Sequence, residues 1–221
     1  FLLPVRYNYM LTLVFAIICL LSLSALLWAE KNESVWGRWI FKIIASSAFV
    51  LIALTLADVT STFSKWMIAG FVFSLTGDIF LIKSAEKNFF KIGIVSFAMA
   101  HIAFILAFVS IGALGISFYV TTLLALCLML ISYKWLIPGL HSEFKAMVIV
   151  YMIIIGIMCS LSGYAWEGSY RNGVLIGAFV FAISDLYVAR EKFIKSEFKN
   201  KIIGLPLYYL AQIFLALSLD W

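Results

Sequence analysis

Charged residues are scarce in this sequence. Only 12% of its 221 residues are Asp, Glu, Lys or Arg, whereas a soluble domain carries about 25%. Apolar residues make up 65%, and the mean hydropathy is +1.09. These values exclude a soluble globular domain and a disordered chain. The apolar runs are too long and too uniform for the alternating strands of a membrane β-barrel, so we predict an all-α polytopic membrane protein.

Cysteine, histidine and catalytic motifs are also sparse. The three cysteines show neither C-x-x-C nor metal-ligand spacing, and there are only two histidines. A disulfide scaffold is therefore excluded, and a histidine-rich metal site is not favoured. The sequence has no H-E-x-x-H, G-x-S-x-G, Walker A or dinucleotide-binding motif. We expect no metal and no cofactor.

Long apolar runs fill most of the chain and predict eight membrane-spanning helices in a single transmembrane domain, residues 1–221. The connections between the runs are too short to form a separate core, so any chemistry must lie within the bundle or at its mouth. The predicted spans are 9–29, 39–57, 66–82, 92–109, 116–133, 146–165, 172–189 and 202–219.

The distribution of Lys and Arg predicts the orientation in the membrane. The four odd-numbered connections carry 12 of these residues, and the tails and even-numbered connections carry 3. Because cytoplasmic loops are rich in Lys and Arg, we place the odd connections in the cytoplasm and both termini on the other side. This explains the net charge of +5 without nucleic acid as a partner.

Two aspartates stand out because ionisable groups inside a membrane are costly and indicate function. Asp78 and Asp185 each lie about four residues before the cytoplasmic end of a predicted span, which is about 6 Å deep. In a partly dry pocket, two such carboxyls can act as one protonated acid and one anionic base. The alternative is that each aspartate caps or pairs locally.

Three further polar residues lie within spans. Lys42 either extends to the lipid headgroups or pairs with a phosphate or an aspartate. His101 and Gln212 lie near the predicted midplane, where they either bond neighbouring helices or belong to a site. Gly173 and Gly177 form G-x-x-x-G, which predicts close packing of the seventh span and an inward-facing Asp185.

Residues from about 39 to 219 resemble the YhhN/TMEM86 family of eight-span lysoplasmalogenases. The resembling residues are Phe73-Ser74, Gly77-Asp78, Leu81, Gly93, Phe97 and His101, then Arg171, Gly177-Ala178, Phe181 and Ser184-Asp185, and finally Tyr209, Ala211 and Gln212.

The resemblance implies a membrane hydrolase that cleaves the vinyl ether bond of lysoplasmalogens. The products would be a fatty aldehyde and glycerophosphoethanolamine or glycerophosphocholine. A lysophospholipid with a vinyl ether chain would be the partner, surrounded by membrane lipids. Asp78 and Asp185 would be catalytic, near the cytoplasmic side. The residues expected to bind or position substrate are Lys42, Ser74, His101, Ser184, Tyr209 and Gln212.

Two other functions remain open from the residues themselves. Intramembrane Asp and His also occur in proton-coupled transporters of small molecules. Such transporters have inverted repeats and broken helices, which the sequence does not show. In the other alternative, a lipid-binding protein without catalysis, the aspartates only hold helices together. The oligomeric state is left open.

Overall fold

The computed structural model describes residues 5–220, and this part of the chain forms eight long α-helices and no β-strand. All eight helices are long and apolar enough to cross a membrane, which confirms the predicted all-α polytopic fold. Their bounds are α1 (Val5–Lys31), α2 (Val35–Leu56), α3 (Thr62–Ile82), α4 (Lys87–Ile111), α5 (Ile116–Leu136), α6 (Ser142–Ser169), α7 (Asn172–Phe193) and α8 (Phe198–Leu217), with a short 3₁₀ turn, η1 (Ile137–Gly139), after α5.

Most helices continue beyond the apolar runs that predict them. Helix α4 begins at residue 87 rather than 92, α6 at 142 rather than 146, and α7 ends at 193 rather than 189. Hydropathy falls at the first charged side chains, but the backbone stays helical where these side chains reach the headgroup region. The helices therefore carry charged residues on ordered extensions of the bundle.

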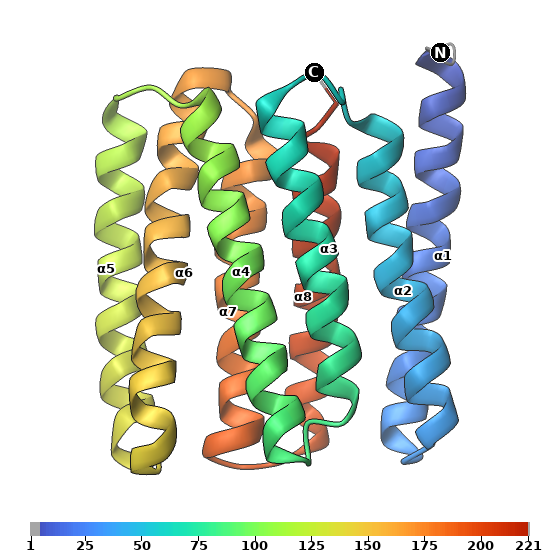
Figure 1. Cartoon of the computed structure of the whole chain (residues 1–221), viewed down its shortest axis with the longest axis vertical. Coiled ribbons are helices and arrows are strands. Elements are labelled where there is room, and N and C mark those ends of the chain that lie inside the picture. The colour runs from blue at the N-terminus through green and yellow to red at the C-terminus, as the bar shows by residue number, and fades with distance from the viewer. Residues whose placement is uncertain (1–4, 221) are drawn as a thin grey trace.

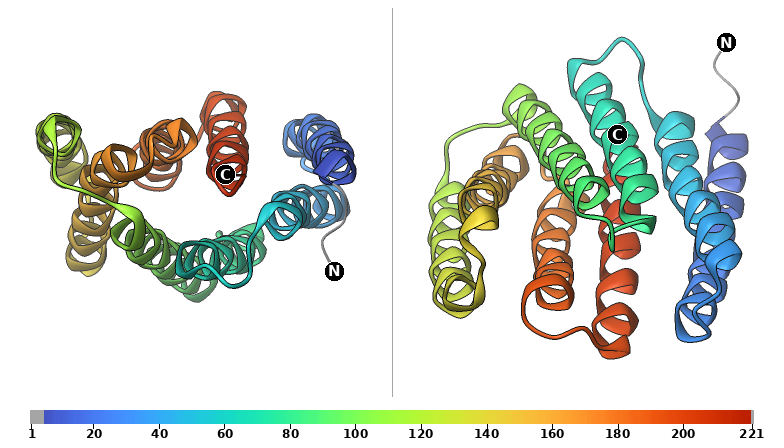
Figure 2. Two further views of the ribbon diagram at one scale, coloured as in Figure 1. Left: turned by 90° about the horizontal axis from the view of Figure 1, so that it is seen from above. Right: turned by 60° about the horizontal axis from the view of Figure 1, so that its bottom comes forward.

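Six helices form a closed ring. Around it, α2 packs on α3, α3 on α4, α4 on α6, α6 on α7, α7 on α8, and α8 returns to α2. Helix α1 packs outside against α2 and α8, and α5 packs outside against α6. Figure 1 shows the helices running roughly side by side, and the view from above in Figure 2 shows α5 and α1 at opposite flanks. The six helices of the ring thus enclose a common interior, with α1 and α5 packed against its outside.

Glycines allow α7 and α8 to approach closely. A Cβ atom at Gly173 would lie 2.3 Å from the carbonyl oxygen of Phe214, and one at Gly177 would lie 3.1 Å from that of Ala211. Only a residue without a Cβ fits the first position, so this pair of helices packs backbone against backbone. The same helix α7 presents Asp185 to the interior of the bundle.

Aromatic side chains fill the centre of the ring, whereas aliphatic side chains cover its outside. Phe71 and Phe104 are fully buried with ring centroids 5.4 Å apart, and Phe181 lies 5.4 Å from Tyr208. The outer face of α5 instead exposes large apolar residues such as Leu123 and Ile131. This distribution suits a bundle whose outer solvent is hydrocarbon.

The connections alternate between the two ends of the bundle. The α1–α2, α3–α4, α5–α6 and α7–α8 connections lie at the lower end in Figure 1, opposite both termini. These four connections are the ones rich in Lys and Arg. The lower end is the one for which the sequence predicts a cytoplasmic location.

Candidate active site

A cavity of about 460 Å³ lies in the lower half of the bundle. Polar residues of the lower end, including Ser84, Lys192 and Lys201, surround one part of it, and apolar residues of α4, α5 and α6 line the rest. Both predicted aspartates, Asp78 on α3 and Asp185 on α7, line this same cavity. Two aspartates from distant parts of the chain therefore line one common space.

Asp78 is held by groups from two other helices. The ammonium nitrogen of Lys42 on α2 lies 3.3 Å from Asp78 Oδ1. Ser46 on α2 and Tyr208 on α8 each donate a hydroxyl hydrogen bond to Oδ2, both at 2.6 Å. Only 3% of Asp78 is exposed. Both carboxylate oxygens are occupied, and a cation balances the charge.

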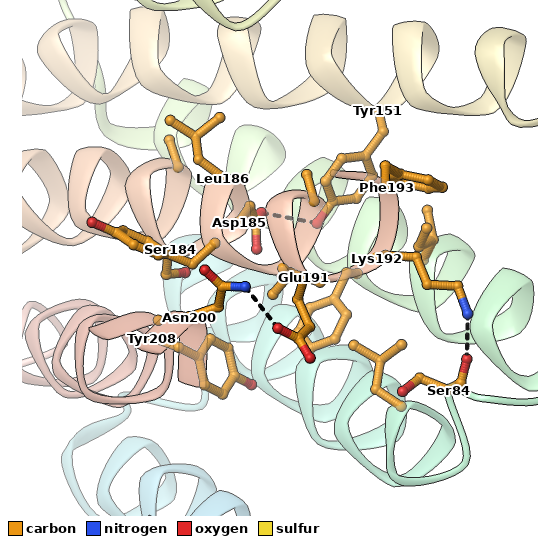
Figure 3. A pocket seen from close by; sticks show the side chains of 18 of the residues that line it. Ser84, Tyr151, Ser184, Asp185, Leu186, Glu191, Lys192, Phe193, Asn200 and Tyr208 are labelled. Atoms are coloured by element: carbon orange, nitrogen blue, oxygen red, sulfur yellow. Dashed lines mark hydrogen bonds between the residues drawn. The ribbon is translucent and has the colours of Figure 1, made fainter. Parts of the chain in front are cut away.

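Asp185 is held on one oxygen only. Tyr151 on α6 donates its hydroxyl hydrogen to Asp185 Oδ2 at 2.9 Å, a bond drawn in Figure 3. His101 Nε2 on α4 lies 3.3 Å from the same oxygen and 3.1 Å from the Tyr151 hydroxyl. Within residues 5–220, Oδ1 accepts no hydrogen bond, and no Lys or Arg lies within ion-pair distance. The carboxyl side chain is 14% exposed, and it lines the cavity.

Asp185 is farther from its helix end than the sequence predicts, whereas Asp78 is about as far from its helix end as expected. Helix α7 continues to Phe193, so eight residues follow Asp185 in the helix instead of about four. Four residues follow Asp78 in α3, so the two carboxyls lie about 6 and 12 Å along the axis from the lower ends of their helices. Lys192 donates to the backbone oxygen of Ser84 at 2.6 Å, so the lower ends of α3 and α7 lie close together.

An aromatic wall separates the two carboxyl clusters. Phe181 packs against His101 on one side, with centroids 4.6 Å apart, and against Tyr208 on the other. Phe97 packs edge-on to both Phe181 and Tyr208. The two clusters share no hydrogen-bond partner among the described residues, so any communication between them passes through the cavity.

The other sequence-predicted residues differ in how closely they join these clusters. Lys42 and His101 contact the aspartates directly, and the Tyr209 hydroxyl lies 3.2 Å from Ser46. Ser184 lines the cavity, but its hydroxyl donates to the backbone oxygen of Phe181. The remaining two, Ser74 and Gln212, are buried with side-chain polar atoms that have no partner in the described part of the chain.

Three side chains that contact the aspartates are absent from the predicted set: Ser46, Tyr151 and Tyr208. Ser46 follows Lys42 by four residues and Tyr208 precedes Gln212 by four, so helical spacing alone places each on the face of a predicted residue. Tyr151 lies in an apolar stretch without such a neighbour, and nothing in the sequence distinguishes it from a packing tyrosine.

Charged residues at the polar end of the cavity are mostly paired. Glu30 on α1 contacts both Arg38, at 3.1 Å, and Lys201, at 2.8 Å. Just outside the helices, the Lys195 ammonium contacts Glu197 at 2.5 Å and holds the pKa of that carboxyl below its usual value. Across the part of the chain that the structure describes, no group of three or more His, Cys, Asp or Glu residues has the geometry to hold a metal ion.

A model of the YhhN family matches residues 37–219, which include every residue of both clusters. The chain belongs to the YhhN family. Two similar relatives are named Lysoplasmalogenase TMEM86A. The one from Bos taurus is 33% identical over 195 residues, covering 85% of this chain and 75% of the relative. The one from Homo sapiens is 30% identical over 206 residues, covering 87% and 82%.

A third relative, Lysoplasmalogenase TMEM86B from Mus musculus, is 29% identical over 201 residues, covering 89% of this chain and 81% of the relative. No solved structure matches the chain. These relatives confirm the resemblance seen in the sequence and the interpretation of this YhhN-family chain as an enzyme. With the eight apolar helices, they identify a multi-pass integral membrane protein.

Proposed function

We propose that this YhhN-family protein hydrolyses the vinyl ether bond of lysoplasmalogens within the cavity. The observation that supports this most directly is that Asp78 and Asp185 line one space that has both a polar end and an apolar wall. The relatives named lysoplasmalogenases supply the substrate class. A single-chain lipid matches a site that lies between helices and has a polar end.

The reaction needs a proton donor, a base and a place for water. A vinyl ether is protonated on the carbon that does not carry oxygen, which leaves an oxocarbenium ion at the other carbon. Water adds to this ion, and the resulting hemiacetal breaks into an aldehyde and an alcohol. A carboxylic acid and a carboxylate can divide these tasks, as they do for the related oxocarbenium intermediates of glycoside hydrolysis.

The surroundings of the two carboxyls favour Asp185 as the proton donor. Its Oδ1 has no protein partner in the described chain and the carboxyl lines the cavity, while Tyr151 and His101 hold Oδ2 in place. Asp78 is paired with Lys42 and accepts two hydroxyl bonds, which suits a carboxylate that stays anionic. Asp78 then takes the proton of the attacking water on Oδ1, which contacts only Lys42, whereas Oδ2 already accepts two hydroxyl bonds.

The proton balance closes over one turnover. Asp185 gives its proton to carbon, and Asp78 receives one from water. When the hemiacetal collapses, its hydroxyl proton passes to Asp185 and the departing glycerol oxygen takes the proton held by Asp78. Both carboxyls return to their starting states, and no metal or cofactor takes part.

The apolar part of the cavity is suited to the alkenyl chain. It extends from Asp185 along α5 and α6, where Leu128, Met152 and Ile155 line it. Burial of each methylene group is worth about 0.8 kcal/mol, so this wall supplies much of the substrate affinity. The chain would then point away from the polar end, as it does in one leaflet of a bilayer.

The test is release of fatty aldehyde from lysoplasmenylethanolamine by the purified protein. We expect turnover by the wild type and none from the saturated alkyl ether lipid, which carbon protonation cannot activate. If the wild type releases no aldehyde from vinyl ether lipids with ethanolamine or choline headgroups, the proposed activity is wrong.

A further inference from the structure

Lys192 differs from the other cations that line the cavity because it has no acidic partner in the described part of the chain. Arg38, Lys42 and Lys201 also line it, and each is paired with an acid. Within residues 5–220, Lys192 has no acidic partner at ion-pair distance; its ammonium donates to the backbone oxygen of Ser84 at 2.6 Å, as Figure 3 shows. It also lies 4.5 Å from the centroid of the Phe90 ring.

An ammonium group has three N–H donors, and the bond to Ser84 uses one of them. Lys192 therefore keeps donors and an unbalanced positive charge at the polar end of a cavity that also contains carboxyl groups. An anion is the ligand that completes such a site, and lysine binds phosphate well as a point charge.

Lys192 also lies in register with Asp185. The two residues are seven apart on α7, so they occupy the same face of the helix about 10 Å apart along its axis. Lys192 follows the apolar run that ends at residue 189, which puts it where a bilayer holds its phosphates, just outside the hydrocarbon. Its position thus fits a lipid headgroup whose chain enters the bundle.

The dimensions of a lysoplasmalogen match this spacing. Seven bonds join its phosphorus to the carbon that accepts the proton, and an extended chain advances about 1.2 Å per bond, which gives about 8 Å. The length of the lipid differs by about 2 Å from the separation of Lys192 and Asp185 along α7, and a flexible lysine side chain can span this difference. Lys42 is not available to bind the phosphate, because its ammonium group is paired with Asp78.

We propose that Lys192 binds the phosphodiester of the lysolipid and so sets the vinyl ether at Asp185. This assignment rests on the proposed function for the identity of the lipid, but it concerns binding alone. Helix α7 then fixes the distance between the two parts of the substrate: Lys192 binds the headgroup, and Asp185, two turns away, contacts the reacting bond.

A binding experiment tests this independently of catalysis. The probe is a 1-O-alkyl lysophosphatidylethanolamine, which has the phosphate but no vinyl ether and is not hydrolysed. Its affinity for the detergent-purified protein is compared with that of 1-O-alkylglycerol, which has the same chain and no phosphate. We expect Lys192→Gln to weaken binding of the phospholipid at least about tenfold and to leave alkylglycerol binding unchanged.

Two matched variants complete the design. Lys192→Arg keeps the charge and should restore most of the phospholipid affinity. Lys199→Gln removes an exposed lysine from the same end of the molecule that does not line the cavity, and it should have no effect. Retained alkylglycerol binding by Lys192→Gln shows that the variant is folded.

Other outcomes would overturn the assignment. Unchanged phospholipid affinity in Lys192→Gln, or equal weakening by Lys199→Gln, would mean that Lys192 is not the phosphate ligand. Displacement of the phospholipid by inorganic phosphate at equal concentration would show a site for free phosphate rather than for a headgroup. If the wild type releases no aldehyde but the binding pattern is as expected, the proposed activity fails and the phosphate site stands.

Discussion

Asp78 and Asp185 line the same cavity, yet their surroundings differ. Asp78 is almost fully buried and is balanced by Lys42, with both oxygens occupied. Asp185 has hydrogen-bond partners on one oxygen, no Lys or Arg partner in the described part of the chain, and a second oxygen without a protein donor. One carboxyl has a cation beside it, and the other has an oxygen without a hydrogen-bond partner in the described part of the chain.

In the reaction that we propose, this difference gives the two aspartates different roles. An acid–base pair works when the environments of its members favour opposite charge states. Here the helix that contributes Lys42 passes close to Asp78, whereas Asp185 contacts His101 on α4 and Tyr151 on α6. The contrast predicts distinct consequences when either carboxyl is replaced.

The largest effect is expected for Asp185→Asn. The amide keeps the shape of the carboxyl but cannot protonate carbon, so kcat for aldehyde release should fall by about 10³-fold or more while the protein stays folded. Asp58→Asn is the matched control, since Asp58 is exposed in the α2–α3 connection. Turnover within tenfold of the wild type would remove Asp185 from the role of proton donor.

Asp78→Asn should reduce both activity and stability. It leaves the Lys42 ammonium buried without its counter-ion, which costs about 3 kcal/mol of unfolding free energy. Adding Lys42→Met should restore the thermal unfolding temperature in detergent but not aldehyde release. Asp185→Asn should unfold close to the wild-type temperature. Equal destabilisation by the two aspartate substitutions would contradict the difference between their surroundings.

The same change in the two tyrosines should have unequal effects. Tyr151→Phe removes one of two groups that hold Asp185, and we expect kcat to fall about tenfold, the equivalent of one hydrogen bond to a charged group. Tyr208→Phe leaves Asp78 held by Lys42 and Ser46, so its kcat should change less. Measurement of kcat against pH for both variants checks this, and a larger loss for Tyr208→Phe would reverse the assigned roles.

The smallest effect concerns the apolar side of the site. Gly156 on α6 lies between the cavity and a second, lipid-facing hollow between α5 and α6, and a Cβ there would lie 2.9 Å from the sulfur of Met129. Gly156→Leu should therefore raise KM several-fold for an 18-carbon alkenyl chain and little for an 8-carbon chain.

Val150, which is exposed on α6 and lines neither the cavity nor the hollow, provides the control for this chain-length effect. Val150→Leu should leave KM unchanged for both chain lengths. An equal loss for short and long chains in Gly156→Leu would mean that the alkenyl chain does not pass this position.

Much of the fold follows from the sequence because a bilayer imposes a simple rule. Each spanning segment must satisfy its own backbone and present apolar side chains, so eight apolar runs predict eight helices. The helix ends are less predictable: α7 reaches Phe193 because charged residues do not stop a helix in the headgroup region. Asp185 therefore lies deeper within its helix than its distance from the apolar boundary indicates.

The residues of the candidate site also differ in how well the sequence predicts them. Asp78, Asp185, Lys42 and His101 stand out because ionisable groups are rare in apolar runs. Tyr151 does not stand out, since a tyrosine in such a run is common and only its contact with Asp185 distinguishes it. The special position of Lys192 depends equally on contacts, because the sequence alone places it among many lysines near helix ends.

The sequence by itself determined that the chain spans a membrane eight times and that a few ionisable groups lie within it, because composition and run length decide solubility in a bilayer. Only the tertiary structure decided which of those groups meet. Pairing depends on how helices far apart in the chain pack around the ring. This packing placed Lys42 beside Asp78 and left one Asp185 oxygen without a partner among residues 5–220.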